Sequence, residues 1–456
     1  MATKPTVKKM KNLSQADILN NIRAHASENY QNAVPMADQN NIATLSEIGK
    51  AVTSTEGIKN EFLSALWNRI ARVIITNKTW SNPIEFFKRG ELELGEIIEE
   101  VFVNIAKPFQ FNQPDSESTV FKREIPDVRS TFYLMNYQKF YECTISDKDL
   151  KLAFLSWSGV DDLIAKMTES MYTAANYDEF LTMRYLVARQ ILDGKMYPYT
   201  IGPTGTVEQT QAAMEAILAL SDNFEFLSPE YNISGVHNAT PKSEQYFLVT
   251  PEFKAKMNVE ILAVAFNMDK AEFMGHLVTV PKFGKLDTAR LAELFAGDPT
   301  YEEISEDKLE ALNKINGVFI SADWFMIYDN LNEFTEIYNP RGLYWNYYLH
   351  TWKTFGVSPF AVNALLLPES PTVTSVTVSP ATATIQVGEI LEMTATVTGT
   401  NYPPNSVTWS SDSENVTVSP DGHVTGVSAT SIAATITATS TFDTTKKGTA
   451  KITVTA

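Results

Sequence analysis

The sequence predicts an α+β body followed by a separate all-β domain. Three observations carry this prediction. Helical spacing runs from Ser146 to Gly194, two aromatic-rich candidate strands lie between Val318 and Val357, and the composition changes abruptly after Leu367. Leu, Phe, Tyr and Asn are abundant before that point, whereas Thr, Val, Ser and Ala dominate after it. A chain of 456 residues is long enough for two or three domains with a large core.

Charge and motif content argue against several classes of protein. The formal net charge is −17 at pH 7, which disfavours a DNA-binding surface built on phosphate neutralisation. The five histidines are dispersed, and the sequence contains no HExxH, Walker A, GxGxxG or GxSxG pattern. We therefore expect no enzymatic activity, no cofactor and no metal site.

Three features bear on the cellular compartment. No apolar run reaches the ~20 residues needed to span a bilayer, so no membrane association is expected. The N-terminal residues are basic but lack the apolar segment of a signal peptide. The single cysteine, Cys143, cannot form an internal disulfide, in agreement with a reducing compartment. The sequence thus predicts synthesis in the cytoplasm of the cell that makes the protein.

The first 75 residues carry a mixed pattern. Ser14 followed by Asp17 predicts a short helix around Ile18. The tract that follows is rich in Asn, Gln and Ala, and it is predicted to run extended over another surface. Helical spacing resumes at Gly57–Ile75, which predicts a helix or a helix–strand pair.

The segment between Trp80 and Pro126 predicts a projecting two-stranded arm. Phe86-Phe87-Lys88-Arg89-Gly90 opens it, an alternating apolar run follows around Val101, and Val120–Pro126 is predicted to form a further strand. An isolated hairpin is only marginally stable in water, so we expect the arm to find its partner on another subunit. The alternative is an ordinary peripheral sheet.

The best helical region extends from Ser146 to Gly194. Helix-start signals occur at Ser146, where acids follow, and again at Ser158, followed by Asp161. Asp193-Gly194 is a typical helix stop. Smaller elements are predicted after it, namely a helix around Val207–Leu218, strands at Tyr246–Thr250 and His276–Val280, and acidic surface helices at Leu286–Leu294 and Glu302–Leu312.

The aromatic region predicts two strands and a final buried strand. The two strands are Val318–Asp329 and Tyr344–Val357, joined across a turn at Asn339-Pro340-Arg341-Gly342. Ala361–Leu367 is almost wholly apolar, as a last buried strand would be. Arg341 is predicted to pair with an acidic residue on the body or on a neighbouring subunit.

Two sequence stretches carry a specific resemblance. NPRGLYWNYYLHTW at the aromatic turn and FKRGELELGEIIEEVF in the arm resemble the major head proteins of small, short-tailed, protein-primed phages of the salasvirus type. The resemblance implies the tailed-phage HK-type capsid fold over residues 1–367. Its expected parts are an N-terminal arm (1–50), an extended loop (80–126), a spine-helix region within the peripheral domain (146–194), an axial domain (196–335) and return strands (336–367).

The segment after Leu367 carries a second resemblance. Pro368 and Pro371 bracket a short polar linker, and short alternating runs follow, separated by turn residues at the spacing of a β-sandwich. VTVSPATATIQVGE, VTWSSDSENVTVSPDGHVTG and ATITATS resemble the bacterial Ig-like group 2 domain, here expected over 372–456. The resemblance implies that Trp409 is the core tryptophan and that Asp421-Gly422 forms a turn.

Together the resemblances imply a major capsid protein that self-assembles, as pentamers and hexamers, into the icosahedral head of a double-stranded DNA tailed phage. The expected partners are other copies of the chain, scaffolding and portal proteins, and packaged DNA held without sequence-specific binding. The Ig-like domain is expected to decorate the outside of the virion. The candidate intersubunit contacts are Phe86, Lys88, Arg89, Gly90 and Arg341. The alternative interpretation is a bacterial cell-surface or adhesion protein, which the missing signal peptide and anchor disfavour.

Overall fold

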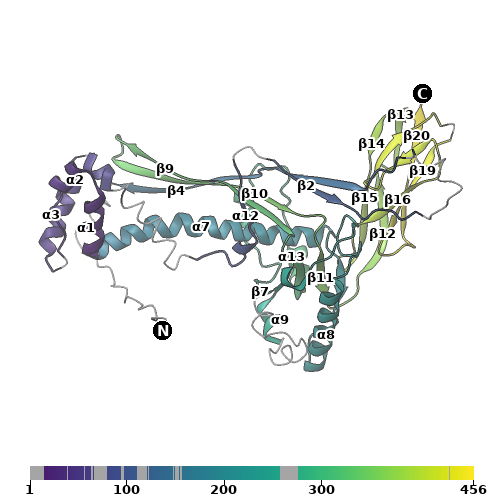
Figure 1. The fold of residues 1–456 in the computed structure, drawn as a ribbon, viewed down its shortest axis with the longest axis horizontal. Helices are drawn as coiled ribbons and strands as arrows, with labels where there is room; N and C mark the ends of the chain where they lie inside the picture. The colour runs from purple at the N-terminus through teal and green to yellow at the C-terminus, as the bar shows by residue number, and fades with distance from the viewer. Residues whose placement is uncertain are drawn as a thin grey trace.

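A long helix and a ribbon of strands run side by side along an elongated molecule (Figure 1). The N-terminal helices lie at one end of it, and the C-terminal domain lies at the other. The structure is a computed structural model that describes residues 15–38, 40–55, 57–62, 65, 80–93, 97–109, 121, 123–146, 148, 154, 157–256, 276–430 and 432–456.

The long helix α7 spans Trp157–Leu192 and packs against a four-stranded sheet. The strand order is β1-β9-β10-β4, with β10 antiparallel to both β9 and β4. The strands are β1 (Gly90–Glu91), β4 (Tyr137–Ser146), β9 (Phe325–Asn339) and β10 (Tyr344–Val357). Side chains alternate along these strands, so rings such as Tyr137 and Tyr347 are buried while Phe140 on the opposite face is exposed.

One predicted strand is wrong in its bounds. The stretch Val318–Asp329 is not continuous, because β8 (Gly317–Ser321) ends and β9 starts only at Phe325. A turn separates the two strands, in which the Trp324 amide donates to the Ser321 carbonyl at 3.0 Å. Trp324 itself is buried, so apolar residues continue through the turn and the sequence pattern hides it. The strand β4 was not predicted at all.

The N-terminal region is helical, which corrects the prediction of an extended tract. The predicted helix around Ile18 is confirmed as α1 (Gln15–His25), and α2 (Glu28–Ala33) and α3 (Ile42–Val52) follow it. Polar residues of the tract act as caps: Ser27 Oγ accepts from the Tyr30 amide, and Asn41 Oδ1 accepts from the Ala43 amide. The apolar faces pack with Trp345, Tyr347 and Leu349 in one cluster. Of the predicted helix at 57–75, residues 57–62 and 65 are helical, and the remainder lies outside the described residues.

A second sheet forms the broad lower part of the body in Figure 1, and helices cover it. Its order is β5-β11-β8-β6-β7. Every residue of β8 and β11 is buried. The predicted small helices and strands of this region are confirmed. The elements are β5 (Pro198–Thr200), α8 (Val207–Asn223), η2 (Lys242–Glu244), β6 (Gln245–Val249), α9 (Pro251–Lys256), β7 (Leu277–Thr279), α12 (Thr288–Leu294), α13 (Glu306–Leu312) and β11 (Asn363–Leu367).

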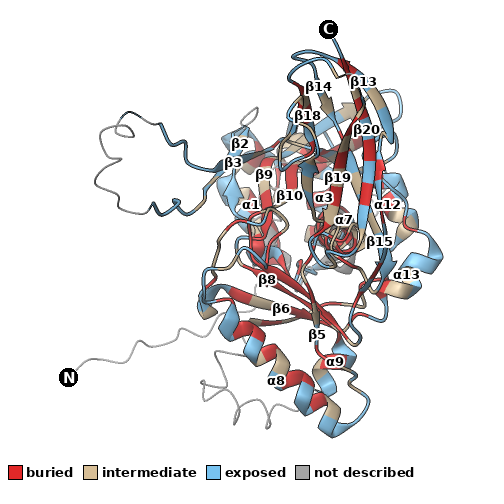
Figure 2. Cartoon of the chain, turned by 90° about the vertical axis from the view of Figure 1, so that its right-hand side faces the viewer, coloured by how far each residue is buried: buried red, intermediate tan, exposed pale blue. Residues whose placement is uncertain are grey.

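A two-stranded hairpin, here called the arm, lies at one side of the body (Figure 2). It is formed by β2 (Ile98–Val103) and β3 (Val128–Tyr133), which pair antiparallel from Ile98↔Tyr133 to Val103↔Val128. The prediction of a strand at Val120–Pro126 is wrong for its described part, since residues 123–126 lie outside any strand. Pro126 lacks an amide hydrogen for a ladder, and pairing starts two residues after it.

The C-terminal domain is all-β, as predicted. Its strands form sheets of order β12-β15, β13-β20-β19-β16 and β14-β18-β17. Trp409 packs against the domain's core, and Gly422 has φ +87 in the predicted turn between β17 and β18. The strands are β12 (Thr372–Ser379), β13 (Thr382–Gln386), β14 (Ile390–Glu392), β15 (Thr394–Thr400), β16 (Val407–Ser411), β17 (Val416–Val418), β18 (His423–Gly426), β19 (Ala434–Ser440) and β20 (Lys447–Thr455).

Candidate intersubunit site

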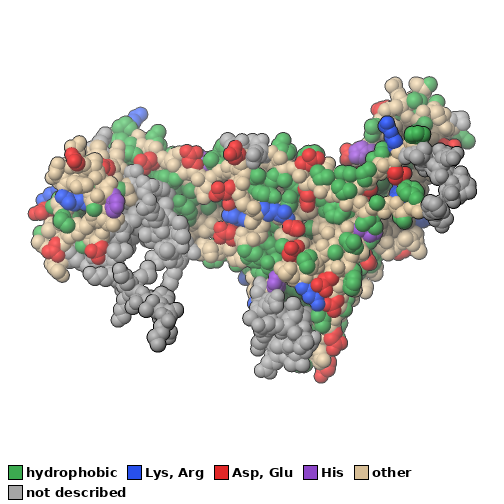
Figure 3. Space-filling model, in the orientation of Figure 1, with side chains coloured by type: hydrophobic (Ala, Val, Ile, Leu, Met, Phe, Trp, Pro, Cys, Tyr) green, Lys and Arg blue, Asp and Glu red, His purple; other side chains and the backbone are tan. Residues whose placement is uncertain are grey.

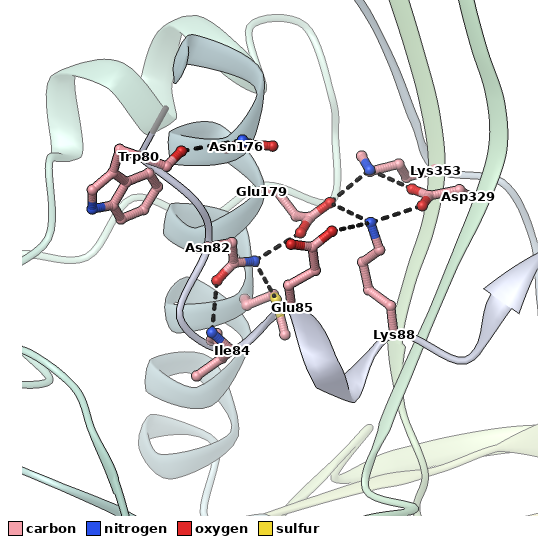
Figure 4. A network of polar contacts seen from close by, with 10 residues as sticks. Trp80, Asn82, Ile84, Glu85, Lys88, Asn176, Glu179, Asp329 and Lys353 are labelled. Carbon is pink, nitrogen blue, oxygen red and sulfur yellow. Dashed lines mark hydrogen bonds and ion pairs between the residues drawn. The ribbon is translucent and has the colours of Figure 1, made fainter. Parts of the chain in front are cut away.

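Residues 80–91, here called the crossing segment, run across the long helix α7 to the edge of β9. The Trp80 ring meets Tyr177 and Phe180 edge to face, with centroids 6.1 and 5.5 Å away. The Asn176 side chain donates to the Trp80 carbonyl at 3.2 Å (Figure 4). A 3₁₀ turn, η1 (Glu85–Phe87), then leads into β1. The segment is thus fixed at its start by aromatic packing on the helix.

Four charged side chains meet where the crossing segment passes over the body (Figure 4): Lys88 of the segment itself, Glu179 of α7, Asp329 of β9 and Lys353 of β10. Glu179 of α7, which is 3% exposed, accepts from Lys353 Nζ at 2.6 Å and lies 3.4 Å from Lys88 Nζ. Asp329 of β9 lies 2.8 Å from Lys88 Nζ and also pairs with Lys353. Asn82 adds a hydrogen bond to Glu179 at 2.7 Å. The network therefore contains two positive and two negative side chains, and its formal charge is zero.

The electrostatics of this network favour the charged forms. Burial alone would lower the pKa of Lys88, but the negative charges of Glu179 and Asp329 outweigh it and raise that pKa above its ordinary value. Burial alone would raise the pKa of Asp329, but Lys353 and Lys88 hold it below its ordinary value. Because a buried ion left without its partner costs about 3–5 kcal/mol, each member depends on the others.

The structure brings together four of the five predicted contact residues. Arg89 Nε donates to the Phe325 carbonyl at 3.1 Å, and its guanidinium pairs with Asp323 at 2.7 Å. Gly90 has φ +130, a conformation that favours glycine, and it pairs with Tyr328 as β1 joins β9. Phe86 is 52% exposed. Phe86, Lys88 and Arg89 line a shallow pocket of about 360 Å³. Contact of this region with a neighbouring copy stays a prediction.

Arg341 lies elsewhere, at the turn between β9 and β10 near the N-terminal helices (Figure 1). The Asn339 side chain shapes this turn by accepting from the amides of Arg341 and Gly342 at 3.0 and 3.1 Å. Arg341 is exposed, and its guanidinium forms no ion pair with another described residue. Its predicted pairing with a neighbouring subunit stays a prediction.

The arm has one face bound to its own body. Glu100 accepts from the Tyr133 hydroxyl at 2.6 Å and from the Ser358 hydroxyl at 2.7 Å. The Phe102 ring stacks on Phe360 with centroids 5.6 Å apart. A Cβ at Gly356 would lie 2.6 Å from the Tyr133 ring, so glycine is required for this contact. Burial and the Glu100 carboxylate raise the pKa of Tyr133, which keeps the hydroxyl a hydrogen-bond donor.

The opposite face of the arm is open to solvent and mainly apolar, with Glu99 and Ser130 as its polar members. Its side chains alternate with the bound ones along both strands, as the pleat of a two-stranded ladder requires. Exposed fractions are 52% for Val101 and 59% for Phe132. The exposed apolar residues of this face and its ends, here called the outer face, are Ile97, Val101, Val103, Val128, Phe132 and Leu134.

Sequence reasoning missed the buried acids that organise the site. Asp178 is fully buried and receives two hydrogen bonds from Arg290 of α12 at 2.8 and 2.9 Å. The Tyr141 hydroxyl of β4 donates to it at 2.7 Å. The signal was present in the sequence, since Asp178 and Glu179 interrupt an apolar helical face between Tyr177 and Phe180. Adjacent acids are usually solvated, and that expectation hid them.

The described residues contain neither a cluster of metal-ligating side chains nor a membrane-spanning helix. No group of three or more His, Cys, Asp or Glu side chains in the described ranges is placed to hold a metal ion. Among the helices that the structure describes, none is both long and apolar enough to cross a membrane.

Comparison with known proteins decides the family. Residues 19–367 match the family described as Phi29-like phage major capsid protein. This chain belongs to that family. The major capsid proteins of Bacillus phages B103 and PZA are 33% and 31% identical to it, over 90% and 86% of this chain and 86% and 82% of theirs. Residues 372–452 match the bacterial Ig-like domain (group 2).

A solved structure supports the same fold for this Phi29-like capsid protein. The capsid structure of Staphylococcus phage Andhra aligns with a TM-score of 0.51 at 14% identity, covering 65% of this chain and 86% of that one. The body therefore has the tailed-phage HK-type capsid fold, with an Ig-like domain after it. The alternative of a bacterial surface protein rested on the Ig-like domain alone, and the family match over the body overturns it.

Proposed function

We propose that the chain builds a closed icosahedral shell around double-stranded DNA, with copies arranged as pentamers and hexamers. Membership of the major capsid family makes it a shell subunit. The observation that carries the assembly proposal is the arm. One face of the arm is bonded to its own body through Glu100 and Phe102, whereas the outer face, with Val101 and Phe132, has apolar side chains in water. A second copy covering that face gains hydrophobic free energy.

The crossing segment supports the arm in this role. Lys88 is tied to α7 and β9, and Arg89 is tied to the start of β9, so the base of the arm cannot slide along the body. Force on the arm from a neighbour then reaches the long helix directly. Phe86 and Gly90 at this base, and Arg341 at the far turn, are the exposed positions that we propose as further contacts between copies.

The Ig-like domain is proposed to lie on the outside of the shell. It follows the last body strand, β11, and has a hydrophobic core of its own. Its Thr- and Ser-rich faces suit water, and a shell filled with DNA leaves little room for it inside. There it would touch cell-wall carbohydrate or stabilise the joins between capsomers.

The remaining partners follow from the function. Scaffolding and portal proteins are proposed to assist assembly, and packaged DNA is held without sequence-specific contacts. The net charge of −17 agrees with the last point, since acidic side chains are spread over the face seen in Figure 3. Synthesis in the host cytoplasm, assembly into the virion and a purely structural, non-enzymatic role complete the proposal.

The outer face gives the direct test. Phe132→Ser should leave a soluble, folded subunit, because the side chain contributes nothing to the body core, but it should abolish or strongly reduce shells seen by electron microscopy. Phe132→Leu is the matched control, which keeps an apolar side chain and should assemble. Wild-type shell yield from Phe132→Ser would overturn the arm's role as a brace. Absence of shells from the wild type together with its co-expressed scaffold would overturn the function.

A further inference from the structure

The segment that joins the Ig-like domain to the body is bonded along its length. The amide of Ile201 donates to the Leu367 carbonyl at 2.8 Å, where β11 ends. Three residues later the Ser370 hydroxyl lies 3.0 Å from the Thr200 hydroxyl, and the next residue, Pro371, is buried. The polar sequence between the two prolines would suggest a free hinge. These contacts show that the linker is instead held against the body.

The loop between β15 and β16 makes a second contact with the body. Gly194 follows the long helix α7 and has φ +63. The Asn405 amide donates to the Gly194 carbonyl at 2.9 Å. A Cβ at Gly194 would lie 2.6 Å from the Pro403 carbonyl oxygen, so the loop backbone rests directly on the end of the helix. The Ig-like domain therefore caps the C-terminal end of α7.

Tyr402 is the residue of this loop that reaches the body's core. It packs against the hydrophobic cluster that includes Ile191 and Leu367. Tyr402 and its neighbour Asn401 both have φ +57, a left-handed conformation that is unfavourable for a bulky side chain and persists only where surrounding contacts hold it. The Tyr402 hydroxyl is buried without a hydrogen-bond partner among the described residues. The contact between Tyr402 and the body therefore depends on packing of its aromatic ring and not on a hydrogen bond of its hydroxyl.

We propose that Tyr402 locks the Ig-like domain to the capsid body, so that this domain and the long helix α7 move as one unit. The strained loop is held because the Tyr402 ring packs, partly buried, against a core that belongs to the other domain. The lock also fixes a cleft of about 960 Å³ between the arm, the body and the Ig-like domain, lined among others by Ser130, Tyr197 and Phe442. The proposal concerns the single chain and stands independently of shell assembly.

The test compares Tyr402→Ala with Tyr402→Phe in the full-length subunit. Two quantities report the lock: hydrogen exchange of the peptide that contains the Asn405 amide, and protease cleavage between residues 367 and 372. Wild type and Tyr402→Phe should be equally protected, because the hydroxyl has no described partner. Tyr402→Ala should exchange and be cleaved roughly tenfold faster, as local opening becomes easier. Ile390→Ala, at a 63% exposed residue of β14 that does not line this cleft, should change neither rate.

Several outcomes would overturn the lock. Equal rates for Tyr402→Ala and wild type would do so, as would a Tyr402→Phe variant that behaves like Tyr402→Ala. If Tyr402→Ala yields no soluble protein, Gly194→Ala gives the second test, because its added Cβ pushes the Pro403 backbone away while the ring is retained. Unchanged exchange at Asn405 in that variant, or rapid linker cleavage in the wild type, would also contradict the proposal.

Discussion

Asp178 and Glu179 are consecutive residues of helix α7, yet they form ion pairs with different elements of the body. Asp178 accepts two hydrogen bonds from Arg290 of α12, whereas Glu179 pairs with Lys353 of β10 and Lys88 of the crossing segment. Side chains of successive helical residues point about 100° apart, so two neighbouring residues can bind two different elements. Here Asp178 binds α12, and Glu179 binds β10 and the crossing segment. This part of α7 therefore connects α12, β10 and the crossing segment to one another.

Removing the Glu179 charge should destabilise the subunit strongly. Glu179→Gln leaves Lys88 and Lys353 to share Asp329, and we expect a loss of about 3–5 kcal/mol in the free energy of unfolding. Urea denaturation of the soluble subunit measures it. Glu85→Gln is the control, because Glu85 also lies 3.4 Å from Lys88 but is half exposed, whereas Glu179 is buried. The control should cost no more than about 1 kcal/mol. Equal losses would contradict the network's role.

The Asp329 carboxylate should make stability depend on acid pH. Its pKa is lower in the folded chain than in the unfolded chain, where it is near the ordinary value of 3.8. The stabilisation is therefore complete above that value and is lost as the pH falls through the lower, folded value. Unfolding free energies measured between pH 6 and roughly pH 3 should fall less steeply in Asp329→Asn than in the wild type. Parallel curves would refute the assignment.

Arg290→Lys should weaken the join between α7 and α12. Lysine keeps the charge but cannot make the two parallel hydrogen bonds to Asp178, and the free energy of unfolding should fall by roughly 1–3 kcal/mol.

Arg341→Ala serves as the contrasting variant. The Arg341 side chain is exposed, so its removal should leave the melting temperature unchanged. If Arg341 contacts a neighbouring copy, only its shell yield should fall. Unchanged assembly would dispose of that contact.

A chain that ends after Glu369 should still fold and form shells, because the body has its own hydrophobic cores. The truncated subunit should melt at a lower temperature than the full chain, since the surface that Tyr402 covers becomes exposed. Electron microscopy and calorimetry of the two chains decide both points. Complete failure to make shells would mean that the Ig-like domain is part of the architecture rather than a decoration.

The sequence predicted elements whose signal is local. The signals for these elements lie within a few tens of residues. They are the helical spacing and caps of the long helix, the alternating pattern of the aromatic strands, and the change in composition at the domain boundary. The strand β4 was missed because its sequence, YQKFYECTIS, does not separate polar from apolar faces: Lys139 lies on the inner face with Tyr137, and Phe140 is exposed on the other. Its partner β10 also lies about 200 residues further along the chain. The helix α2 was missed because its six residues, ENYQNA, are mostly polar. In α3 the buried Leu45, Ile48 and Val52 stand at helical spacing, so its signal was present and was hidden by the polar residues before it.

The site was predictable in position but not in its bonding. Phe86 to Gly90 were singled out from a charged, glycine-containing turn, and the structure gathers them in one place. The partners of Lys88 come from Glu179 and Asp329, residues far along the chain that only the folded arrangement brings together. Sequence spacing holds no information on such pairs, because tertiary packing alone sets the distance between them.

The buried network of Lys88, Lys353, Glu179 and Asp329 sums to zero charge, so it contributes nothing to the chain's net −17. The excess of acid therefore belongs to the rest of the molecule, and every copy repels every other before contact. At physiological salt this repulsion is confined to a Debye length of about 8 Å. Ionic strength should thus govern how fast subunits nucleate a shell. If the arm braces a neighbouring copy as proposed, its outer face should govern whether the shell, once closed, stays closed.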